Sequence, residues 1–295
     1  MIDKINARQA GILCAVMLFA NKLLMLPGVL FREVRTDGFL IYLLFFVLDI
    51  LVLFAILWFK KRKKDVKLNK VWNFIIHFAL IAYFLVGSFF MVQDAFVFIR
   101  DSAYEDVSLL IFAICFLPVA IYAATTGFRG IARTAEFYYK FIVFGIIVCL
   151  VIGVSKIDRM PDFFTADFSQ FSLTMISYML WFTEFVYFAI ILSNTEDSKD
   201  LSKTVLSFVG FAMGLVLVIS YTFYALYPNT GFLHGNSILD ISKISSSHGG
   251  IGNLDIVALL VVTFLLFMQF SVVFRSFVIS AGKVLKIGRS NERDS

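Results

Sequence analysis

Long apolar runs, separated by short polar breaks, dominate this sequence. Several runs exceed the roughly 18 residues that mark a membrane-spanning helix. Lipid cannot hydrogen-bond to an open backbone, and the runs lack the alternating pattern of about ten residues that barrel strands show, so each run is expected to be a helix. The pattern predicts an all-α polytopic membrane protein with eight transmembrane helices, over residues 9–31, 39–59, 71–99, 107–126, 131–154, 172–193, 203–227 and 254–281.

The composition also indicates a membrane protein. Of the 295 residues, 60% are apolar and 16% are charged, whereas soluble domains carry about 25% charged residues. This excludes a soluble enzyme, a disordered tail and a disulfide-stapled secreted domain. The net charge of +5 does not indicate nucleic-acid binding, because the basic residues lie in loops beside apolar spans. The three cysteines lie inside spans without ligand-like spacing, so no disulfide, metal site or cofactor is predicted: Cys14, Cys115 and Cys149.

The distribution of lysine and arginine predicts the orientation. With the N-terminus in the cytoplasm, the inside segments hold 17 of the 26 basic residues and the outside loops hold 6, and cytoplasmic loops of membrane proteins carry such an excess. Both termini are therefore expected in the cytoplasm. The basic run 60–70 is either this topological signal or a surface for anionic lipid or a partner's acidic patch. The remaining basic residues fall inside spans: Lys22, Lys140 and Arg275.

Two outside connections are long enough to have structure of their own. They cover residues 156–171, which carry several aspartates, and residues 228–253, which contain a short apolar stretch before a serine and glycine run. Composition alone favours neither a lid nor a flexible solvated loop in either case.

Charged residues inside the spans are the most informative positions. An ionised side chain at mid-bilayer costs roughly 2.5 to 3.5 kcal/mol on insertion scales, so each one is a hypothesis for a functional site. Asp94 and Arg275 lie near the ends of their spans, where snorkelling to the interface explains them. Five others lie deeper: Lys22, Asp49, Glu136, Lys140 and Glu184.

Lys22 lies too deep to reach the cytoplasmic headgroups. It follows Arg8 by fourteen residues, which is about 21 Å along a helix in a hydrocarbon core about 30 Å thick. Ala20 and Asn21 precede it, and Pro27 and Gly28 follow shortly after. A polar side chain, a charged side chain and a helix-breaking pair together predict a broken first helix, although Pro27 kinking a packed helix is the simpler alternative.

The sixth span carries a second polar interruption at a similar depth. There Trp181, Phe182 and Thr183 lead into Glu184. Broken helices at corresponding positions of two inverted halves indicate the binding site of a secondary transporter, because exposed half-helix ends can hold substrate or ion. Spans one and six are the corresponding pair in a five-plus-five arrangement. The alternative is that Glu184 pairs with a neighbouring residue in a continuous helix.

The order and spacing of several segments resemble the spore germination permease family, the B-type subunits of germinant receptors within the amino acid, polyamine and organocation (APC) transporter superfamily. The similarity runs along most of the chain. None of the segments is specific alone. They are residues 4–9 with 24–28 in the first span, 130–137 at the entry to the fifth, 157–161 outside the membrane, and 181–184 in the sixth.

The resemblance implies a LeuT/APC-like fold with departures. Relatives commonly place small residues in the unwound part of helix one, where this chain has Ala20, Asn21 and Lys22, and they often have proline where it has Lys140. Residues 1–295 are expected to form one integral membrane domain with a first repeat at about 9–154 and a second repeat at about 172–281. Relatives usually have ten helices and this sequence predicts eight, so the second repeat is expected to be incomplete and to lack the last two helices. A partner subunit, a second copy or lipid would cover the surfaces that those helices normally cover.

The resemblance also implies a function. The chain would be a germinant-receptor subunit in the inner spore membrane, beside receptor A and C subunits, that binds a small germinant such as an amino acid at residues 20–22 and 181–184. Lys22 would hold the ligand carboxylate or pair with Glu184 when the pocket is empty, and Lys140 would replace the coupling cation of related transporters.

The sequence also bears on two other function classes. A non-transporting scaffold subunit, with the pocket locked by an ion pair between Lys22 and Glu184, is the alternative that the missing helices favour. An intramembrane enzyme is not expected, because the three histidines form no H-E-x-x-H pair and the sequence has no G-x-S-x-G elbow or glycine-rich phosphate loop.

Overall fold

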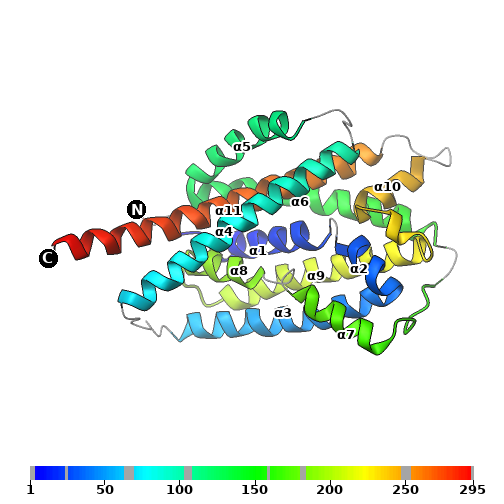
Figure 1. The fold of residues 1–295 in the computed structure, drawn as a ribbon, viewed down its shortest axis with the longest axis horizontal. Coiled ribbons are helices and arrows are strands. Elements are labelled where there is room, and N and C mark those ends of the chain that lie inside the picture. The colour runs from blue at the N-terminus through cyan, green and yellow to red at the C-terminus, as the bar shows by residue number, and fades with distance from the viewer. Residues whose placement is uncertain are drawn as a thin grey trace.

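The computed structural model describes residues 4–23, 26–62, 70–102, 108–157, 160–179, 184–246 and 254–293. Within these ranges the chain forms helices and no β-strand (Figure 1). The α-helices are α1 (Ala7–Lys22), α2 (Leu26–Val34), α3 (Gly38–Lys61), α4 (Lys70–Ser102), α5 (Leu109–Thr125), α6 (Gly127–Val154), α7 (Phe168–Ser177), α8 (Glu184–Ser193), α9 (Leu201–Leu226), α10 (Ser237–Ser246) and α11 (Leu254–Arg293). The described residues also include the short 3₁₀ helices η1 (Arg35–Asp37), between α2 and α3, and η3 (Gly231–Leu233), between α9 and α10.

The prediction of an all-α polytopic membrane protein is confirmed. Five described stretches are long and apolar enough to cross a membrane: Leu26–Lys61, Val71–Arg100, Gly127–Val154, Leu201–Leu226 and Ile256–Leu285. The predicted spans 9–31 and 172–193 each correspond to two shorter helices, α1 with α2 and α7 with α8. The connecting residues 24–25 and 180–183 lie outside the described residues, so the two interruptions stay predictions.

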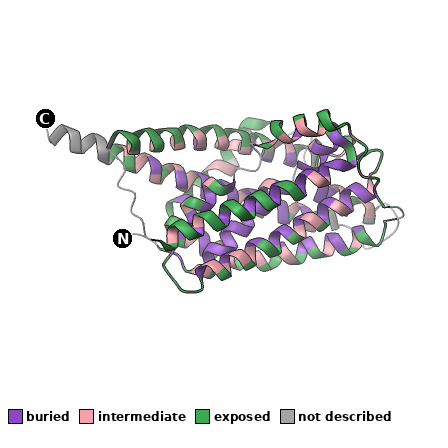
Figure 2. Ribbon diagram, turned by 90° about the horizontal axis from the view of Figure 1, so that it is seen from below, coloured by how far each residue is buried: buried purple, intermediate pink, exposed green. Residues whose placement is uncertain are grey.

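Helix α1 is the centre of the bundle. Every residue from Gln9 to Ala20 is buried, and the helix packs against α6, α8, α9 and α11. A helix that is apolar on all sides, as α1 is, has no solvent-facing stripe and belongs in an interior. Figure 2 shows the same arrangement, with buried central helices and exposed residues along the outer ones.

The outer helices expose apolar side chains that water would not accommodate in such number. On α4, Trp72, Phe78 and Phe89 are 60%, 60% and 67% exposed, and α3 also exposes Leu51 and Phe54. In a multi-pass membrane protein, such a surface faces lipid tails, which are as apolar as the side chains themselves.

A carboxylate fastens the connection before α7 to the turn between α2 and α3. Asp37 is 1% exposed, and its oxygens accept backbone N–H groups from Phe164 at 2.5 Å, Thr165 at 2.7 Å and Ala166 at 2.6 Å. Phe164 adopts a positive φ of 63°, a conformation that costs a non-glycine residue free energy unless its surroundings hold it. Part of the predicted loop 156–171 is therefore structured and hydrogen-bonded to η1.

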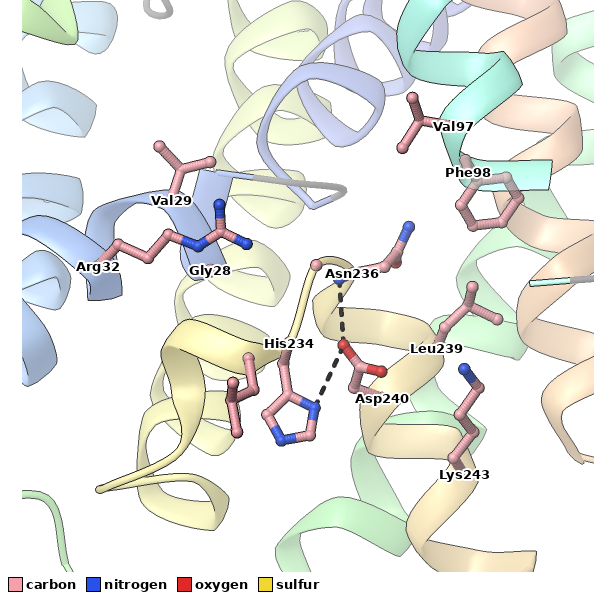
Figure 3. Close-up of a pocket in the computed structure, with 12 residues that line it drawn as sticks. Gly28, Val29, Arg32, Val97, Phe98, His234, Asn236, Leu239, Asp240 and Lys243 are labelled. Carbon is pink, nitrogen blue, oxygen red and sulfur yellow. Dashed lines mark hydrogen bonds and ion pairs between the residues drawn. The ribbon is translucent and has the colours of Figure 1, made fainter. Parts of the chain in front are cut away.

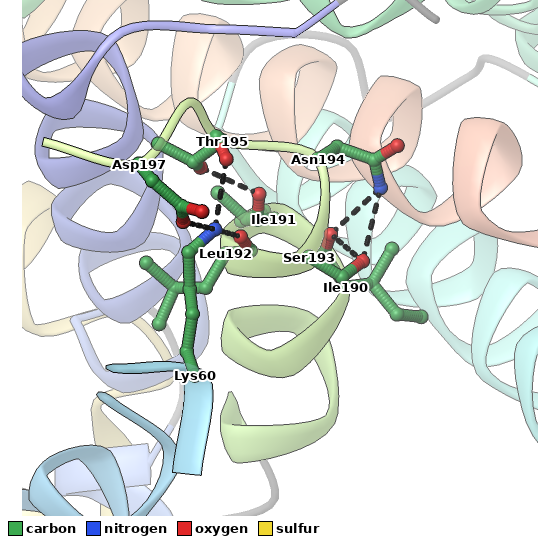
Figure 4. A network of polar contacts seen from close by, with 8 residues as sticks. All are labelled: Lys60, Ile190, Ile191, Leu192, Ser193, Asn194, Thr195 and Asp197. Carbon is green, nitrogen blue, oxygen red and sulfur yellow. Dashed lines mark hydrogen bonds and ion pairs between the residues drawn. The ribbon is translucent and has the colours of Figure 1, made fainter. Parts of the chain in front are cut away.

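The opposite end of the bundle joins the start of α1 to the end of α8. Ile5 donates its N–H to the Asn194 carbonyl at 3.0 Å and accepts the N–H of Glu196 at 2.9 Å. Lys60 of α3 donates from Nζ to the carbonyls of Leu192 and Thr195, the latter at 2.8 Å (Figure 4). The last carbonyls of a helix have no partner within it, so a lysine from α3 completes the C-terminus of α8.

Candidate functional site

Three buried charged residues meet where α1 ends and α8 begins. Nζ of Lys22 donates a hydrogen bond to Oδ2 of Asp49 and lies 3.6 Å from Oε2 of Glu184. Their side chains are 0%, 6% and 1% exposed, respectively. One cation therefore faces two carboxylates in the interior of the bundle, and we call this set the charge cluster.

The end of α1 suits the charge that it carries. Lys22 is the last residue of α1, and Glu184 is the first described residue of α8. A helix C-terminus carries partial negative charge and favours a cation. The end of α1 therefore stabilises Lys22, and Asp49 approaches from the middle of α3.

Further contacts hold Lys22 in place. Its Nζ lies 4.7 Å from the centre of the Phe46 ring, a cation–π distance. Its backbone carbonyl accepts a hydrogen bond from the Tyr42 hydroxyl at 2.8 Å. Tyr42, Phe46 and Asp49 recur at spacings of four and three residues, so they lie on one face of α3 and reach α1 together.

Side chains from two other helices satisfy backbone carbonyls around the α1 to α2 connection. Ser237 of α10 donates to the Leu23 carbonyl at 2.5 Å, and the Tyr224 hydroxyl of α9 donates to the Pro27 carbonyl at 3.2 Å. Carbonyls that leave a helix in an apolar environment need such partners. The backbone that the resemblance would leave available to a ligand is thus already hydrogen-bonded at these positions.

The remaining predicted residues of the first span lie close to the charge cluster. Ala20 is 2% exposed in α1, and the side-chain oxygen of Asn21 accepts a hydrogen bond from the Gln269 amide of α11. Pro27 and Gly28 fall in the first turn of α2, where a missing N–H and a fixed φ are tolerated. Gly28 is required by close approach, because an added Cβ would lie 2.2 Å from the His234 carbonyl oxygen.

Other predicted residues are not brought to the cluster. Lys140 lies on the exposed side of α6, so its proposed role as a coupling-ion surrogate remains an expectation. The predicted ligand contacts Trp181, Phe182 and Thr183 lie outside the described residues. Glu136 pairs instead at the Ile5 end of the bundle, with Arg8 at 3.2 Å and the Gln9 amide at 3.4 Å.

Asp49 is the cluster member that sequence reasoning did not assign to the site. It stands out as a mid-span charge, but its span carries no helix-breaking residues to mark it. The signal that could have found it is the spacing of Tyr42, Phe45, Phe46 and Asp49, which are all buried on one stripe of α3.

Neither carboxylate oxygen of Glu184 makes a hydrogen bond among the described residues. A buried carboxylate without hydrogen bonds is costly, because it loses water and gains no compensating donor. Asp49, in contrast, takes the direct hydrogen bond from Lys22. Glu184 is therefore the member of the cluster with acceptor capacity left for a further donor.

No curated protein and no solved structure matches the chain. A family model described as spore germination protein matches residues 4–292, which includes the charge cluster and nearly all of the described helices. The helical, multi-pass architecture and this match together show that the chain belongs to the spore germination protein family, a permease-type family of membrane proteins.

Proposed function

We propose that this protein is the permease-type subunit of a germinant receptor and that it binds a small molecule, such as an amino acid, at the charge cluster. The observation that carries the proposal is the buried set of Lys22, at the end of α1, with Asp49 of α3 and Glu184 of α8. Ionisable residues inside a membrane protein are costly, and a buried ion pair is weak evidence of stabilisation, so such residues indicate a functional site.

The geometry favours Glu184 as the group that receives the ligand's ammonium. Lys22 is already hydrogen-bonded to Asp49, whereas the Glu184 oxygens have no hydrogen-bond partner in the part of the chain that the structure describes. With all three groups ionised, the cluster carries one negative charge in excess. An incoming ammonium, or a proton, would neutralise that charge and add charge-assisted hydrogen bonds. The ligand carboxylate would then draw Lys22 away from Glu184.

Binding there would act on two helices at once. The start of α1 and the end of α8 are joined through Ile5 and residues 194–196, while the other ends of these helices meet at Lys22 and Glu184. Separation of that pair would change how α1 and α8 sit between α3 and α11. In the inner spore membrane, receptor A and C subunits would detect this change.

A second function has its own supporting observation. Lys22 contacts both carboxylates and is 0% exposed, and side chains occupy the neighbouring carbonyls of Leu23 and Pro27. A permanently locked cluster of this kind would suit a subunit that scaffolds other receptor components without binding a ligand.

Direct binding and flux measurements separate the two functions. We would reconstitute the full chain in proteoliposomes and measure saturable binding and uptake of labelled amino acids. The receptor proposal predicts saturable binding that weakens about tenfold or more in Glu184→Gln, since a charge-assisted hydrogen bond contributes roughly that factor. Glu196→Gln, which neutralises an exposed acid, should bind as wild type does. A wild-type chain with neither binding nor uptake across the panel would support the scaffold.

A further inference from the structure

A second site lies toward the Asp37 end of the bundle, between α2, α4 and α10. It is a cavity of about 370 Å³, and we call it the outer cavity. That volume is within the range of small-molecule sites. Its walls come from Gly28, Val29 and Arg32 of α2, Val97 and Phe98 of α4, residues 233–236, and Leu239, Asp240 and Lys243 of α10 (Figure 3).

The lining has a guanidinium on one wall and a carboxylate with a lysine on the facing wall. Figure 3 shows Arg32 extending from α2 on one side, and Asp240 and Lys243 from α10 on the other. Arg32 donates from Nε to the Phe232 carbonyl at 3.0 Å, which fixes the guanidinium while its fork retains further N–H donors. A small cavity with a guanidinium on one side and a carboxylate on the other matches a ligand that carries both charges itself.

Neighbouring groups hold Asp240 in position. Its Oδ2 accepts the backbone N–H of Asn236 at 3.1 Å and lies 3.6 Å from Nδ1 of His234. The His234 ring packs against Tyr227, with centroids 3.8 Å apart, and the Tyr227 hydroxyl donates to the Asp240 carbonyl at 2.8 Å. The acid is therefore pre-organised, which lowers the entropy cost of binding.

Asn236 supplies an independent indication of a ligand. Both polar atoms of its side-chain amide are buried and have no hydrogen-bond partner among the described residues. An unsatisfied buried amide costs free energy, and this one belongs to a residue that lines the outer cavity. A ligand with both a donor and an acceptor would satisfy it.

We propose that the outer cavity binds a free α-amino acid, with its carboxylate at Arg32 and its ammonium at Asp240 beside the Asn236 amide. This deepens the proposed function and rests on it, because it gives the same class of ligand a first binding position. The two sites are connected: Ser237, at the start of α10, donates to the carbonyl of Leu23, the residue after Lys22. A ligand in the outer cavity would therefore act on the end of α1 through the hydrogen bond between Ser237 and Leu23.

The chain offers a matched pair of substitutions to test the outer cavity. An added Cβ at Gly235 meets no heavy atom within 4 Å, so Gly235→Leu adds bulk at the cavity lining without a backbone collision. Gly210 in α9 is equally open and lies away from the cavity lining, so Gly210→Leu makes the same chemical change as a control. Lys156→Gln, at an exposed lysine, is the control for neutralising Arg32.

The measurement is titration calorimetry of the full chain in lipid nanodiscs. The probes are L-alanine, L-valine, L-leucine and L-phenylalanine, each beside the analogues that lack its amino or carboxyl group. The proposal predicts binding of at least one amino acid, about tenfold weaker binding of both its analogues, and a loss of about tenfold or more in Asp240→Asn, Arg32→Gln and Gly235→Leu. Both control variants should bind as wild type does.

Contrary results are distinguishable. If none of the four amino acids binds, the outer cavity is not an amino-acid site. If Glu184→Gln abolishes binding while Asp240→Asn and Gly235→Leu leave it intact, the result overturns the proposed site in the outer cavity and supports binding at the charge cluster. If the cavity variants lose binding while Glu184→Gln keeps it, the result supports the site in the outer cavity and shows that the ligand does not bind at the charge cluster. Melting temperatures accompany every variant, and Gly235→Leu serves where a charge substitution fails to fold.

Discussion

Replacing Lys22 by methionine removes the only cation that the charge cluster places between its two carboxylates. At the 3.6 Å separation from Glu184, two unit charges attract by about 5 kcal/mol with an effective dielectric constant of about 20. Removing one partner of a buried pair typically costs about 3 to 5 kcal/mol, because the remaining charge keeps its desolvation penalty. Lys22→Met should therefore lower the free energy of unfolding by about 3 to 5 kcal/mol.

The assay is equilibrium unfolding of the purified chain in mixed micelles, with denaturing detergent as the variable. Lys140→Met is the matched control, since it deletes a lysine on the exposed side of a membrane-length helix and leaves no buried acid behind. The triple variant Lys22→Met, Asp49→Asn, Glu184→Gln removes every charge of the cluster. It should recover most of the lost stability, to within about 2 kcal/mol of wild type, because replacing a whole buried ionic set is often close to neutral.

Two results would refute this reasoning. If Lys22→Met unfolds at the same detergent fraction as Lys140→Met, the cluster is not an interacting buried set. If the triple variant is less stable than Lys22→Met alone, the two carboxylates are not the source of the loss.

Three other substitutions test contacts that position the site. Asp37→Asn should lower the free energy of unfolding by about 1 to 3 kcal/mol, because charge-assisted hydrogen bonds to backbone N–H groups weaken. It should also speed proteolysis within residues 160–166. Equal cleavage in Asp37→Asn and in the exposed control Asp162→Asn would contradict the role of Asp37 in holding this segment. Lys60→Met should accelerate hydrogen exchange of the last turn of α8 by roughly tenfold, because its carbonyls lose their cap, whereas Lys61→Met should leave it unchanged. Gly28→Ala should lower stability by about 1 to 3 kcal/mol in thermal unfolding, since its Cβ would lie 2.2 Å from a backbone oxygen of the segment before α10; wild-type stability would contradict that close approach.

Much of the architecture followed from hydropathy alone. Long apolar runs identify helices because lipid permits little else. The few charged residues that fall deep inside these runs are the candidates for a functional site. Lys22 and Glu184 were predicted to face each other, and the structure places them 3.6 Å apart. The rise per residue gives the depth at which each residue lies, and the family resemblance implied that the two residues pair when the pocket is empty.

Rotation about the helix axis was harder to predict. Spans such as α3 and α6 are apolar on most sides, so the pattern of residues gives only a weak direction for the buried face. Asp49 turned inward to Lys22, while Lys140 turned outward. The hydrogen bonds of Asp37 to residues 164–166 and the outer cavity depend on loops and short helices, where local composition does not determine long-range contacts.

The most direct test of the central claim, that the charge cluster receives the germinant signal, is the germination response of spores that carry Glu184→Gln in place of the wild-type chain. At matched levels of the protein in the spore membrane, the account predicts that the amino-acid concentration for half-maximal germination rises about tenfold or more, while Glu196→Gln spores respond as wild type does. A Glu184→Gln strain with the wild-type dose response would show that germination does not pass through the cluster.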